Sequence, residues 1–210
     1  MYSLGSELTL EKTLNLSGYK CQALYDKAEG TPFIFLHGLS YTIEVWERIG
    51  VIDGLLAKKI PFLALDMPYG IKSDSQPKNR DPQANVAVVA EAVKTLFDDE
   101  APVIVGASLG GYIALNYAAN YPVKGLLLVA PAYAFENLDL ALKYSNFHFP
   151  VRIVWGKNDN VISGEEMRTL ADKLPNAKLL VYNNAAHAAY KDQPEWFLND
   201  LLSLYANATI

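Results

Sequence analysis

The sequence predicts an α/β protein in which helices cover both faces of a mostly parallel sheet of eight strands. Three observations lead to this prediction. Short, continuously apolar runs alternate with helical stretches along most of the chain. These runs lack a polar face, which is typical of parallel strands buried on both sides. The first 25 residues differ, because their pattern indicates two strands joined by a tight turn.

The two N-terminal strands are expected at Leu8–Leu16 and Tyr19–Tyr25, joined at Ser17-Gly18 as an antiparallel hairpin at the sheet edge. The remaining six strands are expected at Pro32–Leu36, Pro61–Leu65, Val103–Ala107, Gly125–Val129, Val151–Trp155 and Lys178–Tyr182. The helices are expected at Ile43–Lys58, Pro82–Phe97, Gly110–Asn120, Gly164–Leu174 and Pro194–Ala206. Strand, helix and strand in alternation predict a parallel sheet with right-handed crossovers.

The composition narrows the classes of function before any motif is considered. With 210 residues, of which 51% are hydrophobic and 20% charged, the chain is expected to form one globular domain over residues 1–210. Its net charge of −5 argues against a nucleic-acid binder, which usually has a basic face. We find neither an apolar window long enough to span a membrane nor a signal-peptide pattern. Cys21 is the only cysteine, so we expect no internal disulfide and a cytoplasmic location.

The strand Val103–Ala107 runs into Gly-Ala-Ser-Leu-Gly-Gly, with Ser108 at the centre, and an apolar helical stretch follows. A Gly-x-Ser-x-Gly match alone is weak, but between a buried strand and a helix it has a mechanical meaning. A sharp turn there lifts the serine out of the sheet, and small neighbours avoid backbone clashes. The helix N-terminus also favours developing negative charge. We predict that Ser108 is a nucleophile; the alternative is a plain turn whose glycines serve packing.

A serine hydroxyl needs a base to remove its proton, and the chain has three histidines. His37 and His187 each follow a strand directly, whereas His148 precedes one. Chemistry in open sheets of this kind lies beyond the carboxyl ends of the strands. The chain order of serine, acid and then histidine favours His187 as the base. We expect His37 to shape its loop by hydrogen bonding, and the alternative for His187 is an ordinary surface histidine.

The acid is expected at the end of another strand, before the histidine in the chain. The run Val151–Trp155 leads into Gly-Lys-Asn-Asp, which predicts Asp159 as the carboxylate that orients the imidazole. An aspartate that bonds only to the backbone of its own turn is the alternative. Glu136 and Asp139, which follow the preceding strand, are the fallback acids.

An oxyanion hole needs two backbone N–H groups aimed at the developing negative charge. One is expected from Leu109, the residue after the nucleophile. The other is expected from the loop that follows the third strand, where Leu39 is the first choice and Ser40 the second.

With these residues placed, the chain resembles the α/β-hydrolase family over nearly its whole length, and within it the small, lidless hydrolases related to the cell-cycle-gene-interacting factor B. The matching segments are LHGLSYTIEVWERIG, LDMPYGIKS, VGASLGG, WGKND and AAHAAYKDQPEWF. The resemblance implies a three-layer α/β-hydrolase fold and a serine hydrolase that cleaves acyl esters without a cofactor or metal. Residues Asp66–Ser73 depart from the Asp-x-Pro-Gly-x-Gly-x-Ser pattern that is common in relatives, so the shape of this loop is not predicted.

Many relatives insert a cap between the sixth and seventh strands, but here only residues 130–150 are available, which is room for a short helix and a loop. We therefore expect no cap domain. This segment is rich in aromatic residues: Tyr133, Phe135, Tyr144, Phe147 and Phe149. They either line an open acyl pocket or cover the edge of the sheet, and the sequence does not decide between these roles.

The leading hypothesis is a carboxylesterase-type serine hydrolase that acts on a small-molecule acyl substrate through an acyl-enzyme. Acyl-amine hydrolysis, thioester hydrolysis and acyl transfer on the same triad are alternatives within the fold. A non-catalytic interaction protein that retains the fold is an alternative from another class. The sequence leaves open the physiological substrate, the oligomeric state and any protein partner.

Overall fold

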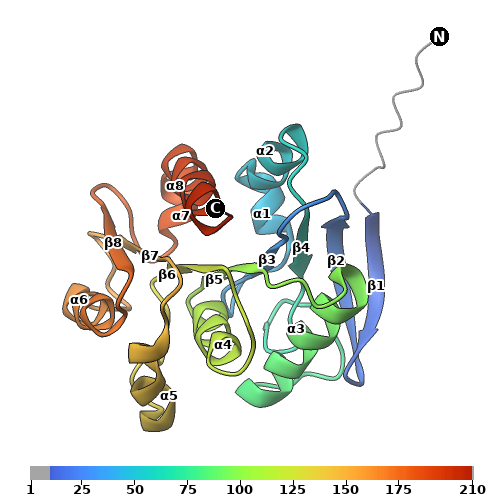
Figure 1. The fold of residues 1–210 in the computed structure, drawn as a ribbon, viewed down its shortest axis with the longest axis horizontal. Coiled ribbons are helices and arrows are strands. Elements are labelled where there is room, and N and C mark those ends of the chain that lie inside the picture. Colours follow the sequence, from blue (N-terminus) through green and yellow to red (C-terminus); the bar gives the residue numbers. More distant parts are fainter. Residues whose placement is uncertain (1–9, 210) are drawn as a thin grey trace.

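A computed structural model describes residues 10–209, and its eight strands form one sheet in the order β1-β2-β4-β3-β5-β6-β7-β8 (Figure 1). The strands are β1 (Leu10–Leu16), β2 (Tyr19–Asp26), β3 (Phe33–Leu36), β4 (Phe62–Leu65), β5 (Val103–Ala107), β6 (Gly125–Val129), β7 (Val151–Gly156) and β8 (Ala177–Tyr182). β2 is antiparallel to both β1 and β4, and all other neighbours are parallel. This confirms the predicted sheet and hairpin; residues 8 and 9 of the first predicted strand lie outside the described residues.

Helices cover the sheet on both faces. They are α1 (Glu44–Arg48), α2 (Val51–Ala57), α3 (Pro82–Phe97), α4 (Leu109–Ala118), α5 (Leu138–Lys143), α6 (Gly164–Lys173), α7 (Ala189–Asp192) and α8 (Pro194–Ala208), with a 3₁₀ turn η1 at Tyr144–Asn146. Figure 1 shows α1, α2, α7 and α8 on one face and α3 to α6 on the other. The three-layer architecture predicted from the sequence is therefore confirmed.

Two apolar cores result from this arrangement, one on each side of the sheet. Alternate residues of each strand enter opposite cores: in β3, Ile34 and Leu36 pack under α3 and α4, whereas Phe33 and Phe35 pack under α1, α2 and α8. The largest side chain in the second core is Trp46, which is fully buried. Because both faces of each central strand are buried, the strands lack the polar alternation of an edge strand.

The stretch 43–58 forms two helices, so the single helix predicted there is wrong. Gly50 lies between α1 and α2 with φ of 74°, in the left-handed region. Its N–H donates to the carbonyl of Glu47 at 2.8 Å and so closes the last turn of α1. The glycine thus ends one helix and begins the next at an angle.

The segment between β6 and β7 holds only α5 and η1, which confirms the expected lack of a cap domain. In the part of the chain from 10 to 209, no helix has the length and apolar character that a membrane crossing requires.

Replacing Gly50 with alanine is expected to lower the free energy of unfolding by about 1 kcal/mol, because a left-handed backbone is strained for a residue with a Cβ atom. An added methyl group would meet no atom within 4 Å, so steric clash does not contribute. Gly50→Asn should cost clearly less, since asparagine tolerates this conformation. Urea denaturation measures both variants, and an equal loss for alanine and asparagine would contradict this explanation of the helix break.

Candidate active site

Ser108 occupies a sharp turn between β5 and α4. Its backbone has φ of 51° and ψ of −113°, an unusual conformation for a residue with a side chain. The turn is held from both sides: Ser108 N–H donates to the carbonyl of Val129 at 2.8 Å, and the carbonyl of Ser108 accepts from the N–H groups of Gly111 and Ala132 at 2.9 and 3.0 Å. The strained turn is therefore fixed by hydrogen bonds to the neighbouring strand and loop, as expected for a nucleophile elbow.

Gly110 lets the first turn of α4 pack directly on the end of β3. A Cβ atom there would lie 2.3 Å from the carbonyl oxygen of Leu36 and 2.7 Å from that of His37. This close approach brings the next loop beside the serine, since a Cβ atom built on Gly38 would lie 3.7 Å from the Cβ atom of Ser108. The loop from which the sequence predicts an oxyanion donor thus lies next to the predicted nucleophile.

The two predicted oxyanion donors are free of protein partners. Within residues 10–209, neither the N–H of Leu39 nor that of Leu109 donates a hydrogen bond to another protein group. Leu109 is the first residue of α4, where a backbone N–H has no partner inside the helix.

Asp159 and His187, the predicted acid and base, are hydrogen-bonded to each other. Nδ1 of His187 lies 2.9 Å from Oδ2 of Asp159; the Asp159 side chain is fully buried, while that of His187 is 26% exposed. A carboxylate only accepts hydrogen bonds, so Nδ1 carries the proton and donates it. This leaves the lone pair on Nε2, the tautomer that a general base requires.

The other carboxylate oxygen of Asp159 binds its own turn. Oδ1 accepts from the N–H groups of Val161 and Ile162 at 2.8 and 3.0 Å. One carboxylate oxygen thus caps the turn, and the other contacts the histidine that the sequence predicts as the base. The fallback acids Glu136 and Asp139 make no contact of this kind with His187 in the described part of the chain.

Backbone hydrogen bonds tie the loop of the acid to the loop of the histidine. Lys157 N–H donates to the carbonyl of Tyr182, and Asn158 N–H donates to the carbonyl of Ala185, both at 2.9 Å. The side chain of Asp192, in α7, accepts from the N–H of Ala186 at 2.8 Å. The position of the imidazole is therefore fixed by the sheet edge on one side and by α7 on the other.

All three predicted triad residues follow the carboxyl ends of parallel strands: Ser108 follows β5, Asp159 follows β7 and His187 follows β8. In the described part of the chain the Ser108 hydroxyl makes no hydrogen bond, to His187 or to any other group. The structure thus joins Asp159 to His187, and among the described residues the Ser108 hydroxyl on the same edge has no partner. Contacts between a catalytic serine and its base are often long before substrate binds.

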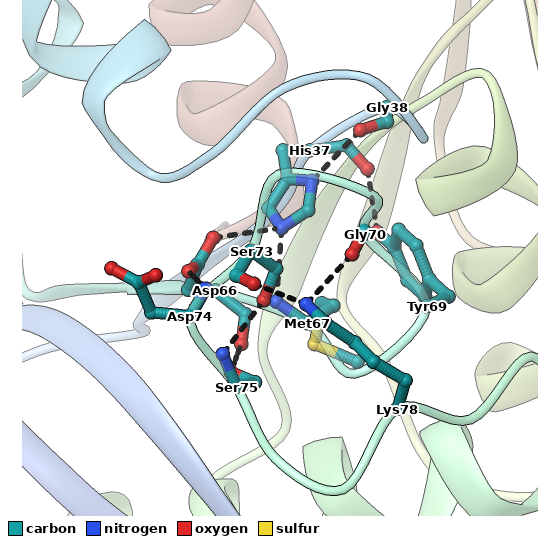
Figure 2. A network of polar contacts seen from close by, with 10 residues as sticks. All are labelled: His37, Gly38, Asp66, Met67, Tyr69, Gly70, Ser73, Asp74, Ser75 and Lys78. Carbon is teal, nitrogen blue, oxygen red and sulfur yellow. Dashed lines mark hydrogen bonds and ion pairs between the residues drawn. The ribbon is translucent and has the colours of Figure 1, made fainter.

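His37 has a structural role at this edge of the sheet, and Figure 2 shows the polar network that surrounds it. Its ring is fully buried; Nδ1 lies 2.8 Å from the carbonyl oxygen of Gly38, and Nε2 accepts the N–H of Met67 at 2.9 Å. The hydroxyl of Tyr69 donates to the carbonyl of His37. These bonds tie the loop after β3 to the loop after β4, which is the loop-shaping role expected for His37.

Asp66 fixes the second of these loops, whose shape the sequence left open. Its Oδ2 accepts from the N–H of Asp74 at 2.8 Å, and Oδ1 lies 3.2 Å from Nε2 of His37 (Figure 2). Burial acts to raise the pKa of Asp66, but the hydrogen bond from the Asp74 N–H stabilises the charged form, and this pKa lies below that of an ordinary aspartate. Nε2 of His37 accepts the Met67 N–H and therefore has no proton to donate to Asp66. The hydrogen bond that the carboxylate accepts at this point comes from the Asp74 N–H.

A cavity of about 600 Å³ lies beside Ser108. Tyr133 and Phe135 line it, whereas Tyr144 and Phe147 are buried in the core under α5. Some rings of the aromatic segment thus line this cavity, and others pack in the core. Sequence reasoning did not identify Glu166, which lines the same cavity from α6; only its proximity to the strand end of β7 could have indicated it.

Comparisons with known proteins agree with this architecture. A family model described as alpha/beta hydrolase fold matches residues 31–149, more than half of the chain. The protein ABHD14A of Danio rerio is 28% identical over 172 residues, which cover 80% of this chain and 62% of that protein. The chain thus spans less than two thirds of that relative. A Homo sapiens protein named "Putative protein-lysine deacylase ABHD14B" is 27% identical over 173 residues, which cover 80% of each chain.

Among solved structures, the crystal structure of a predicted CIB-like hydrolase from Thermoplasma acidophilum superposes with a TM-score of 0.84. The alignment covers 96% of this chain and 99% of the other at 19% sequence identity. At this level of identity the likeness shows the fold alone.

Replacing Asp66 with asparagine is expected to lower the free energy of unfolding by roughly 1–2 kcal/mol near neutral pH, because a hydrogen bond to a charged group becomes one to a neutral group. The pKa of Asp66 is lower in the folded chain than the value of about 3.9 for an unfolded aspartate. The carboxylate's contribution is therefore complete above that value and is lost as the pH falls through the folded pKa. Urea titrations at several pH values should show the two proteins converging below about pH 4.

Asp172→Asn is the matched control, because this aspartate is exposed on α6. It should leave stability nearly unchanged at every pH. A difference between wild type and Asp66→Asn that stays constant down to about pH 3 would contradict the assigned role of the Asp66 charge.

Proposed function

The chain belongs to the α/β-hydrolase family, and on this premise we propose that it is a serine hydrolase that cleaves carboxylic esters through an acyl-enzyme. The hydrogen-bonded pair of Asp159 and His187, on the sheet edge that also holds Ser108, carries the proposal. The unengaged serine hydroxyl at a strained strand-to-helix turn supports it further.

In the proposed reaction, Oγ of Ser108 attacks the acyl carbon while Nε2 of His187 takes the hydroxyl proton. The buried Asp159 carboxylate stabilises the imidazolium that forms. The imidazolium then gives its proton to the leaving alcohol as the ester bond breaks, which leaves an acyl group on Ser108. Water repeats the same steps, with His187 as its base, and releases the carboxylic acid.

The N–H groups of Leu39 and Leu109 are proposed to bind the oxyanion of each tetrahedral intermediate. Neither N–H has an acceptor within residues 10–209, and the His37 network holds the Leu39 loop in place beside Ser108. Preorganised donors of this kind typically contribute about 10²–10³ in rate each, because they need no rearrangement when charge develops.

Acyl-amine hydrolysis is a second candidate, which the name of the human relative favours. The same nucleophile, base and oxyanion donors serve both reactions, since only the leaving group differs. We further propose a small-molecule acyl substrate and a cytoplasmic site of action; the latter rests on the lone, buried Cys21.

Variants of the triad test the main proposal. Ser108→Ala, His187→Ala and Asp159→Asn should each lower kcat/KM for nitrophenyl acetate by roughly 10⁴-fold. Because the three residues act as a unit, the double variant Ser108→Ala with Asp159→Asn should lose little more than Ser108→Ala alone. Steady-state hydrolysis, followed by release of nitrophenolate, measures each protein.

Asp139→Asn is the matched control, since Asp139 is a fallback acid that makes no contact with His187 in the described residues. It should retain wild-type activity. Undiminished turnover by Ser108→Ala, or an equal loss in Asp139→Asn and Asp159→Asn, would overturn the proposed assignment.

A substrate panel separates the two candidate reactions. An ester, a thioester and an amide with the same acetyl group are compared by kcat/KM. The ester should be the best substrate if the main proposal holds, because its leaving group needs the least assistance from His187. Faster turnover of an acyl-amine than of the matched ester would favour the second candidate.

A further inference from the structure

The cavity beside Ser108 is lined by both apolar and acidic side chains. Aromatic and aliphatic side chains, including Tyr133, Phe135 and Ile162, form much of it. Its charged lining, among the described residues, consists of Glu136 from the loop after β6 and Glu166 from α6. Two negative charges therefore face a cavity that also contains the predicted nucleophile.

These two carboxylates lack protein partners. Within residues 10–209 neither Glu136 nor Glu166 accepts a hydrogen bond through its side chain, and neither takes part in an ion pair. By contrast, Glu44 and Glu100, elsewhere on the surface, pair with Arg48 and Lys124. Burial and the nearby charge of Glu136 raise the pKa of Glu166. The two groups thus repel each other, and the cavity lining in the described part of the chain contains no lysine or arginine.

An acidic lining is not shared by every cavity, although a small cavity of about 80 Å³ that contains Asp66 and Asp74 is also lined by carboxylates. A separate cavity of about 440 Å³, formed by the loop after β3, α1 and α7, is lined by Arg48, Lys72 and Lys191, with Glu44 as its acidic residue. The net charge of the chain therefore does not by itself explain the acidic walls beside Ser108.

We propose that the cavity beside Ser108 selects substrates whose portion seated there carries a positive charge, such as an ammonium group. This inference rests on the proposed function, because it assigns a substrate class to the same nucleophile. A cation placed between Glu136 and Glu166 relieves their repulsion, and the ring of Tyr133 or Phe135 offers a further attractive surface for it. A substrate with a carboxylate in this position would be disfavoured.

The test compares substrates that differ only in charge. Acetylcholine, the acetate ester of choline, is paired with its carbon isostere, in which a tert-butyl group replaces trimethylammonium. A second pair of nitrophenyl esters carries the same two groups at the end of the acyl chain, so that either half of the substrate can present the charge. Wild type should favour the cationic member of at least one pair by about twofold to fivefold in kcat/KM for each carboxylate engaged.

Variants identify the source of this preference. In the double variant Glu136→Gln with Glu166→Gln the preference, measured as the ratio of kcat/KM for the cationic and neutral members of a pair, should disappear. Glu165→Gln is the matched control, because this exposed residue neighbours Glu166 but does not line the cavity. It should keep the preference. In wild type the preference should also fall as ionic strength rises from about 0.01 to 0.5 M.

Failure of this inference and failure of the proposed function give different results. If wild type does not hydrolyse even the neutral esters, the proposed function fails. Binding of the phenyltrimethylammonium cation, compared between wild type and the double variant by calorimetry, then tests the charge selectivity without turnover. Equal preference in wild type and the double variant, or equal cation binding by both, would overturn the inference.

Discussion

The buried carboxylate of Asp159 is the constraint on which the rest of the site depends. A fully buried charge is costly unless hydrogen bonds replace the water it has lost. Two backbone N–H groups of its own turn and the imidazole of His187 supply those bonds. Because the first two hold the carboxylate in place, the third bond sets both the orientation and the tautomer of His187. The turn at the end of β7 therefore sets the position of the His187 imidazole.

Backbone hydrogen bonds also hold the side of the site that contains Ser108. The strained turn at Ser108 is fixed by backbone bonds to the end of β6 and the loop that follows it, and the close approach of Gly110 sets the distance to the end of β3. The buried ring of His37 then joins the two loops that border the serine (Figure 2). Backbone groups at the strand ends thus position the side chains that are proposed to react.

Local pattern was enough to predict the sheet and its hairpin, because buried strands have a distinctive composition. It also predicted that Asp159 and His187 lie together, because the ends of parallel strands meet at one edge. It failed at Gly50, where an otherwise helical stretch is interrupted by a single residue with a left-handed backbone. It also missed Glu166, which lies on a helix after β7 and reaches the cavity only through the three-dimensional packing of α6. The aromatic segment was ambiguous for the same reason, since composition does not show which rings face the core.

The most direct test of the central claim is to find the residue that a fluorophosphonate labels in the native protein. Such a reagent reacts with a serine whose nucleophilicity is raised by a neighbouring base. Peptide mass spectrometry should locate a single adduct on Ser108, formed much more slowly when Asp159 is replaced by asparagine. A folded protein that takes up no label, or that is labelled only at another residue, would contradict the claim that residues at the strand ends activate Ser108.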